Sequence, residues 1–252
     1  MKPRLWPGIA VLAALSGPVT AEEAGDGPFL IDSRAAYRES RARDRPLLID
    51  FQTSWCQACE VMERTTWRDA GVQALLSRFV ALSVDGERNR NLAQRYDVQA
   101  YPTIVIAEPG GEPILVLLGL QDPPSMRDHL TRVTEEWNEV RLWAVEASLR
   151  RPAPGALVGL ADFARARGAW AQAESLYRRA LRHEKSLPAE LSLETRAGLA
   201  EVLTATGRCG EALKILGKAT PGKTDEWTAR MVELRDGVDE RCGDRVGKPR
   251  GR

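Results

Sequence analysis

Two cysteines separated by two residues follow directly on a short apolar segment. Leu47–Phe51 is rich in aliphatic residues, as a buried strand is, and Cys56 and Cys59 come soon after it. The residues Cys59–Thr66 have helical spacing, so the pair lies between a strand and a helix. Two thiols on the first turn of a helix can close into a disulfide with little rearrangement. The pair therefore requires a strand that ends where a helix begins, and it predicts redox chemistry there.

The position of Cys56 at the start of the helix predicts its role. Backbone N–H groups are unpaired there and the helix dipole is positive, and both favour a thiolate over a thiol. Because the thiolate is the nucleophile, we expect Cys56 to attack a substrate disulfide. Cys59 would then resolve the mixed disulfide, and the reverse sequence would insert a disulfide. This chemistry needs no cofactor beyond the redox-active Cys56–Cys59 disulfide.

A zinc site is the alternative interpretation of this cysteine pair. A structural zinc ion takes four ligands, usually from two such pairs or from one pair and two histidines. The other cysteines, Cys209 and Cys242, are distant from the pair, and the chain has only two histidines, His129 and His183. We therefore expect no metal site.

Short apolar runs alternate with segments of helical spacing in the first half of the chain. This alternation predicts an α/β fold, with a central mixed sheet flanked by helices. The tight turn Pro109–Glu112 predicts that the last two strands are antiparallel. The expected strands are Leu47–Phe51, Phe79–Val84, Thr103–Ala107 and Ile114–Leu118, and the expected helices are Ser33–Arg43, Cys59–Thr66, Ala70–Arg78 and Asn91–Tyr96.

A long amphipathic stretch follows Asp122. Apolar residues recur at spacings of four and three from Met126 to Ala147, which predicts a single helix that runs to Arg151 before Pro152. Such a helix would close the first domain with its front half and enter a second domain with its back half. A coiled-coil dimer is the alternative, but the apolar stripe is short and its flanks lack ordered charge pairs.

The composition changes after Gly155 to Ala, Leu, Arg and Glu, without a strand signal. Residues from Leu157 to Leu181 fall at the spacings of a tetratricopeptide repeat, and a weaker copy spans Leu199–Ala219 after an insertion around Ser186–Ser192. A last helix, Asp225–Arg241, would cap the stack, because two helix pairs alone leave an apolar face uncovered. The sequence thus predicts an all-α tetratricopeptide-like domain, with a generic helical bundle as the alternative.

The N-terminus is typical of a secretory signal. A basic start precedes the short apolar segment Leu5–Leu15, and small residues lead to a predicted cleavage site after Ala21. The apolar segment is shorter than the roughly 20 residues that a membrane span needs, although an uncleaved anchor is the alternative. We expect a mature protein without stable membrane insertion. Its high arginine content is typical of GC-rich bacteria, which indicates the periplasm, an oxidising compartment.

Several positions around the cysteine pair resemble the thioredoxin superfamily. Asp50 lies where thioredoxins carry a buried aspartate, Tyr101-Pro102-Thr103 matches their cis-proline loop, and Gly119 matches the glycine after their final strand. More narrowly, three segments are similar to periplasmic thioredoxin-like proteins and to the C-terminal domain of the thiol:disulfide interchange protein DsbD. These are Trp55-Cys56-Gln57-Ala58-Cys59, Met62-Glu63 with Thr66-Trp67, and Phe79-Val80. The resemblance implies a thioredoxin-like fold and thiol:disulfide oxidoreductase activity.

The resemblance also implies roles for individual residues. Asp50 would help to deprotonate the resolving cysteine, because burial favours its neutral form and lets it exchange a proton near neutral pH. Trp55 would shield the disulfide. The loop of Tyr101, Pro102 and Thr103 would bind the substrate, as would Gly119 by letting its backbone approach. The alternatives are a buried carboxyl without a kinetic role for Asp50 and a plain core residue for Trp55.

Two features near the cysteines indicate the direction of electron flow. Gln57-Ala58 contains no histidine to stabilise a thiolate, and Glu60 places a negative charge beside Cys59. Destabilised thiolates favour the disulfide form and hence a more reducing enzyme. We therefore expect a protein-disulfide reductase that acts on a client protein with a disulfide or thiols. Its electrons would come from a thiol donor such as a membrane thiol-transfer protein.

The charge balance and the helical repeats limit the class of partner. The 36 basic and 35 acidic side chains nearly cancel, so we expect no nucleic-acid partner. The repeats would dock a partner protein. A non-catalytic scaffold or chaperone-like protein is the alternative function, although binding alone has no need of Cys56, Cys59 and Pro102 together.

The remaining cysteines, Cys209 and Cys242, would form a structural disulfide in the periplasm, with two buried free thiols as the alternative. The predicted organisation then divides the chain into six parts. These are a signal peptide (1–21), a linker (22–28), a thioredoxin-like domain (29–137), a helical connector (138–152), a tetratricopeptide-like domain (153–243) and a flexible basic tail (244–252).

Overall fold

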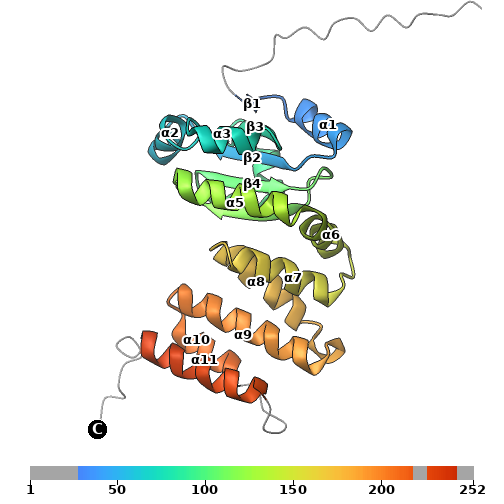
Figure 1. Cartoon of the computed structure of the whole chain (residues 1–252), viewed down its shortest axis with the longest axis vertical. Coiled ribbons are helices and arrows are strands. Elements are labelled where there is room, and N and C mark those ends of the chain that lie inside the picture. The colour runs from blue at the N-terminus through green and yellow to red at the C-terminus, as the bar shows by residue number, and fades with distance from the viewer. Residues whose placement is uncertain (1–27, 218–225, 243–252) are drawn as a thin grey trace, which may run out of the picture.

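A computed structural model describes residues 28–217 and 226–242. The predicted signal peptide, nearly all of the predicted linker and the predicted tail lie outside these residues. Over the described ranges, no helix has the length and apolar character needed to cross a bilayer. An α/β unit lies at the top of Figure 1, and layers of helices follow below it as far as the C-terminal helix.

Five strands form one mixed sheet in the order β1-β3-β2-β4-β5. Strands β1 and β2 pair in parallel with β3, whereas β4 is antiparallel to both β2 and β5. The predicted mixed sheet is confirmed, and the sequence missed only the two-residue strand β1, which is too short to show a period. The strands are β1 (Phe29–Leu30), β2 (Leu47–Gln52), β3 (Val80–Asp85), β4 (Thr103–Ala107) and β5 (Pro113–Leu118).

Alternate residues of the central strand β2 enter two different cores. Leu47, Ile49 and Phe51 pack on the side of α1 and α4, whereas Leu48 packs on the side of α2, α3 and α5. Since side chains alternate along a strand, Asp50 lies on the same face as Leu48, under α2. The helices around the sheet are α1 (Ser33–Arg43), α2 (Gln57–Arg64), α3 (Ala70–Leu76), α4 (Arg90–Arg95) and α5 (Pro123–Glu135).

The predicted single helix through residue 151 is wrong. The structure has two helices, α5 and α6 (Trp137–Ser148), because Glu136 leaves the helical conformation with φ −98° and ψ 15°. The bend lets α5 pack on α3 while α6 packs on β5 and on the next helix, α7. The Glu136 carboxylate accepts a hydrogen bond from Arg167 at 2.9 Å, which ties the bend to the helical region. The apolar period continues across the bend, so it could not reveal it.

The helical region consists of two helix pairs and a capping helix, which confirms the predicted tetratricopeptide-like architecture. Each pair turns at a glycine with positive φ, Gly168 at 71° and Gly207 at 78°, so the two turns correspond. A short 3-10 helix, η1 (Glu184–Ser186), lies between the pairs, near the predicted insertion. The helices are α7 (Pro154–Arg165), α8 (Trp170–Leu181), α9 (Ala189–Ala205), α10 (Cys209–Gly217) and α11 (Glu226–Cys242).

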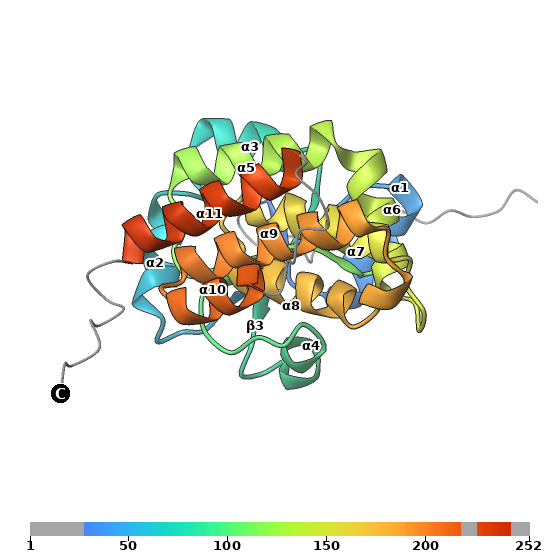
Figure 2. The ribbon, with the colours of Figure 1, turned by 90° about the horizontal axis from the view of Figure 1, so that it is seen from below.

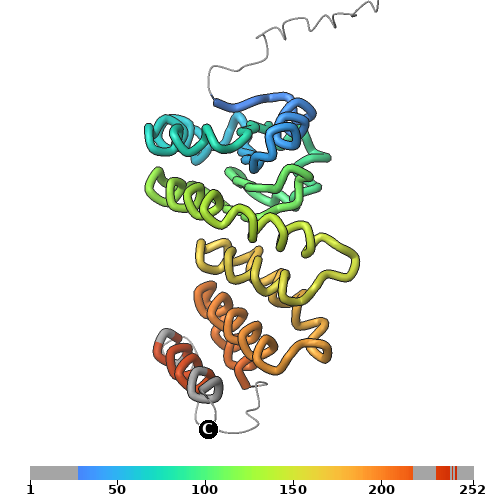
Figure 3. The backbone as a smooth tube through the Cα atoms, turned by 45° about the vertical axis from the view of Figure 1, so that its right-hand side comes forward, coloured from blue at the N-terminus to red at the C-terminus, as the bar shows by residue number. Residues whose placement is uncertain are grey.

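The helical region is packed onto the sheet rather than linked flexibly to it. One continuous cluster of buried side chains runs from Leu48 of the sheet through Leu157 of α7 to Val238 of α11. Figure 3 shows the helices as successive layers below the sheet, and Figure 2 shows α9, α10 and α11 together at the lower end. The α/β unit and the repeats therefore share a core over the described residues.

Candidate functional site

The two cysteines of the predicted redox site form a disulfide at the start of α2. Cys56 caps the helix: its Sγ accepts the backbone N–H of Cys59 at 3.1 Å, and its carbonyl accepts that of Glu60 at 3.1 Å. The Cα atoms of the pair are 5.2 Å apart, and each residue is 7% exposed. The nucleophile predicted from the sequence thus lies at a helix N-terminus, where a thiolate is favoured.

Four further predicted residues are linked by contacts that start at Trp55, the neighbour of Cys56. Trp55 is 64% exposed, so it is not a core residue. The ring centroids of Trp55 and Tyr101 are 6.0 Å apart, and the two rings are nearly perpendicular. The Tyr101–Pro102 peptide bond is cis. The backbone N–H of Gly119 donates to the Pro102 carbonyl at 2.9 Å, which fixes the end of β5 next to the proline loop. The proline loop is thus linked through Tyr101 and Trp55 to the cysteine motif.

Thr103 is the predicted substrate residue that the structure places elsewhere. It is fully buried in β4, and its hydroxyl donates to the Ala100 carbonyl at 2.7 Å. Its side chain therefore holds the proline loop from inside and does not reach the surface on which a client would lie.

Asp50 is buried on β2, on the face that α2 covers. Burial raises the pKa of its carboxyl to about 7, while a hydrogen bond from Trp67 acts in the opposite direction and the charge of Glu63 raises the pKa further. The indole Nε1–H of Trp67 donates to Oδ2 at 2.9 Å, and Oδ1 makes no hydrogen bond with any described residue. A carboxyl with this pKa can accept and release a proton at neutral pH.

Two features of this site were not anticipated from the sequence. Trp67 belongs to a segment that resembles DsbD, but nothing in its spacing indicates that its indole reaches Asp50. Glu60 pairs with Arg64 at 2.8 Å in an exposed position, so its charge acts on Cys59 less than the bare sequence suggests.

The second cysteine pair forms a disulfide in the helical region. Cys209 begins α10 and Cys242 ends α11, and the residues are 5% and 2% exposed. The bond therefore ties the capping helix to the second helix pair. No group of three or more potential metal ligands occurs among the described residues.

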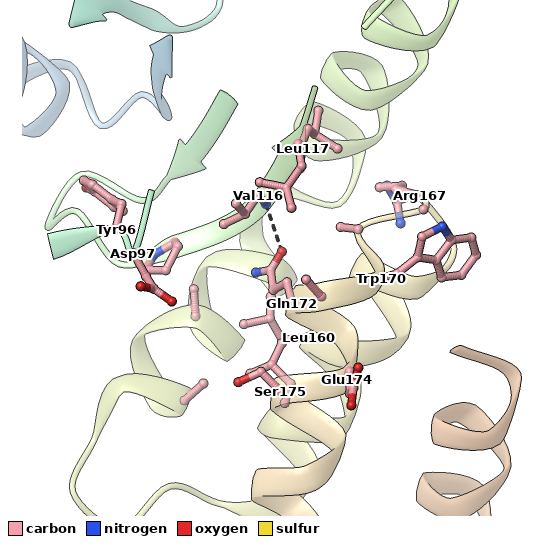
Figure 4. A pocket seen from close by; sticks show the side chains of 18 of the residues that line it. Tyr96, Asp97, Val116, Leu117, Leu160, Arg167, Trp170, Gln172, Glu174 and Ser175 are labelled. Atoms are coloured by element: carbon pink, nitrogen blue, oxygen red, sulfur yellow. Dashed lines mark hydrogen bonds between the residues drawn. The ribbon is translucent and has the colours of Figure 1, made fainter. Parts of the chain in front are cut away.

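A cavity of about 690 Å³ separates the outer edge of β5 from the helical region. Gln172 of α8 bridges it: its amide oxygen accepts the Val116 N–H at 2.9 Å, and its amide nitrogen donates to the Ile114 carbonyl at 3.1 Å. Figure 4 shows this bridge, with Tyr96 and Asp97 on one side and Arg167 and Trp170 on the other. Leu118 and Gln121 extend the lining to the two sides of Gly119, next to the redox site.

Comparisons with known families and sequences agree with this architecture. A family described as thioredoxin-like matches residues 29–109, and a tetratricopeptide-repeat family matches residues 153–225. The thiol:disulfide interchange protein DsbD of Vibrio vulnificus is 32% identical over 96 residues, which cover 36% of this chain and 16% of that protein. DsbD 1 of Pseudomonas aeruginosa is 33% identical over 104 residues, which cover 39% of this chain and 18% of that protein. The match thus spans less than a fifth of the length of these relatives.

Solved structures also match part of the chain. The solution structure of a thioredoxin from Thermus thermophilus has 28% sequence identity and a TM-score of 0.39, and the match covers 42% of this chain and 86% of that one. The two family matches together place a thioredoxin-like region at residues 29–109 and a tetratricopeptide-repeat region at residues 153–225.

Proposed function

We propose that this protein is a periplasmic protein-disulfide reductase, and that its helical repeats help to hold the client. The observation that carries the proposal is the Cys56–Cys59 disulfide at the N-terminus of α2. A binding-only domain has no use for a disulfide placed where one sulfur is activated by the helix and a buried carboxyl of matched pKa lies on the strand beneath.

The proposed reaction uses the reduced enzyme and takes place in two exchanges. The Cys56 thiolate attacks one sulfur of a client disulfide, and the other client sulfur leaves and takes up a proton. The Cys59 thiol then gives its proton to Asp50 and attacks the Cys56 sulfur, which breaks the bond between Cys56 and the client. The second client sulfur leaves with the electron pair, takes a proton from Asp50 and is released as a thiol. The client gains two electrons and two protons, and the enzyme is left with the disulfide that the structure contains.

The reductase direction is supported by the residues between the cysteines. Neither Gln57 nor Ala58 adds a positive charge that would stabilise the thiolate. Because an oxidising periplasm would keep the disulfide closed, turnover requires a dithiol donor, for which a membrane thiol-transfer protein is suited. The predicted signal peptide supports export to that compartment.

The cavity beside β5 is suited to the client chain on one side of its disulfide. Its lining continues from Leu118 and Gln121, which flank Gly119, toward Trp170 and Arg179 of the repeats. An extended segment leaving the redox site along this edge would meet the end of β5 first and helical side chains next. The repeats would thereby add affinity without taking part in the chemistry.

Trapping tests the whole proposal. Replacing Cys59 with Ser stops resolution, so mixed disulfides with clients should accumulate through Cys56 in periplasmic extract. The Cys56→Ser, Cys59→Ser double variant is the matched control and should trap nothing. A reduced enzyme that neither forms a Cys56-dependent adduct nor reduces a protein disulfide would refute the proposal and favour a scaffold. A measured potential as high as that of a periplasmic oxidase would refute the reductase direction alone.

A further inference from the structure

The indole of Trp67 is fixed in one orientation by its surroundings. It is 3% exposed, and its ring stands edge-on to Phe29 with the ring centroids 5.0 Å apart. Its backbone N–H donates to the Met62 carbonyl at 3.0 Å, and its carbonyl accepts the side-chain amide of Gln73 at 3.1 Å. The residue is thus held from α2, from α3 and from β1, and it keeps its ring N–H directed at β2.

This orientation makes the two oxygens of Asp50 unequal. Oδ2 accepts the Trp67 Nε1–H at 2.9 Å, whereas Oδ1 is buried without a hydrogen bond from any described residue. When one oxygen of a carboxylate already accepts a hydrogen bond, the other oxygen is the one left to accept a proton. We infer that Trp67 is a positioning residue, which holds Oδ2 and so makes Oδ1 the atom that takes the proton of Cys59.

The inference deepens the proposed function and rests on it. In the resolving step, the Cys59 S–H bond breaks and its proton goes to Asp50 Oδ1. The Cys59 sulfur then forms its bond to Cys56 as the bond between Cys56 and the client sulfur breaks. The departing client sulfur carries the electron pair and takes the proton back from Oδ1. Trp67 takes no part in bond making and acts through Asp50 alone.

The groups around Asp50 set the direction of the expected effect. From α2, the charge of Glu63 raises the Asp50 pKa, while β3 and β4 place Ser83 and Ile104 opposite it, and neither of these titrates. The Trp67 bond favours the carboxylate and lowers the pKa against the larger effect of burial. Loss of this N–H should therefore raise the Asp50 pKa by about one unit, since a bond to a charged group contributes about that much.

The test compares Trp67→Phe with Phe29→Leu. Trp67→Phe removes the N–H and keeps an aromatic ring, whereas Phe29→Leu loosens the packing of the same indole and keeps its N–H. Carbon-13 NMR titration of Asp50 in the oxidised protein measures the pKa of its carboxyl directly and needs no redox activity. The pH dependence of client release from a Cys56 mixed disulfide reads the resolving step.

We expect Trp67→Phe to raise the midpoint of the Asp50 titration and the midpoint of the client-release profile by about one pH unit each. Below the midpoint, client release should be about tenfold slower. Phe29→Leu should leave both midpoints in place. If Trp67→Phe does not fold, benzothienylalanine at position 67 retains both rings without the N–H and should give the same shift. In an Asp50→Asn background, Trp67→Phe should no longer change the pH profile.

An unchanged Asp50 titration in Trp67→Phe would overturn the inference. A shifted titration with an unchanged release profile would also overturn it, because Trp67 would then set the pKa without positioning a proton acceptor. Failure of the proposed function is seen separately, as a wild-type protein that titrates as expected and exchanges no disulfide.

Discussion

The two disulfides of this chain are the same bond in opposite surroundings. Cys56–Cys59 closes a separation of 3 residues at a helix N-terminus, beside an exposed tryptophan and a buried carboxyl. Cys209–Cys242 closes a separation of 33 residues between two helices, among buried apolar side chains. The two disulfides thus differ in the side chains around their sulfurs, and these side chains decide whether a disulfide is suited to exchange. In the proposed function the first pair uses the buried carboxyl and the exposed surface beside it, whereas the second pair only joins two helices.

The largest expected effect separates the pairs by activity. Cys56→Ser should lower the rate of protein-disulfide reduction by roughly 10³-fold or more, because the attacking thiolate is gone. The double variant Cys209→Ala, Cys242→Ala should retain a rate within a few-fold of the wild type. The measurement is reduction of a model protein disulfide by the pre-reduced enzyme. Equal losses in both variants would show that the second pair also exchanges and would break the comparison.

The second prediction separates the pairs by stability. Removing Cys209–Cys242 should lower the free energy of unfolding by about 4 kcal/mol, and removing Cys56–Cys59 by about 2 kcal/mol, because the longer loop constrains the unfolded chain more. Urea unfolding of the two double-alanine variants in the absence of reductant gives the difference. If the Cys56–Cys59 variant lost more stability than the other, the second bond would not be a staple for α11.

The third prediction concerns the carboxyl beneath the first pair. The folded-state pKa of Asp50 is raised from 3.8 to about 7, so the folded protein holds this proton where the unfolded chain has lost it. The protonated Asp50 therefore makes its full contribution to the free energy of unfolding below about pH 4. That contribution is lost as the pH rises to about 7. Relative to the wild type, Asp50→Asn should gain stability on the order of 3–4 kcal/mol between pH 4 and pH 8.

Urea unfolding of oxidised wild type and Asp50→Asn at the two pH values makes this measurement. A gain that is the same at both would mean that burial does not hold the proton on Asp50. This pH dependence belongs to the redox end of the molecule, where Asp50 lies.

Local sequence signals predicted much of this fold. The strand of Asp50 is a short apolar run and the helix Ser33–Arg43 has helical spacing, and the turn residues Gly168 and Gly207 mark the two helix pairs. The bend at Glu136 left no such signal. The bend lets α5 and α6 pack on different helices, α3 and α7. An apolar stripe continues through a bent pair of helices as it does along a straight helix, so the stripe does not show the bend.

The candidate site was predictable where its residues are adjacent in the sequence. Cys56, Cys59 and Trp55 form one motif, and the strand pattern buries Asp50. The contact between Trp67 and Asp50 crosses from the end of α2 to β2, so no periodicity reports it. Thr103 shows the converse limit: its place next to Pro102 predicted a substrate contact, while its own side chain is fully buried in β4.

The smallest expected effect lies where the two regions meet. Gln172 offers β5 an acceptor and a donor, as a neighbouring strand would, and so covers an edge that is otherwise open. Gln172→Glu keeps the shape and loses the donor to Ile114, so it should weaken this junction by roughly 1–2 kcal/mol. Hydrogen exchange at the Val116 amide measures it, with about tenfold faster exchange expected, while the Cys209–Cys242 end keeps its protection. Unchanged exchange at Val116 would show that the redox domain and the repeats are joined by their shared apolar core alone, so that the cavity edge is free to receive a client without displacing Gln172.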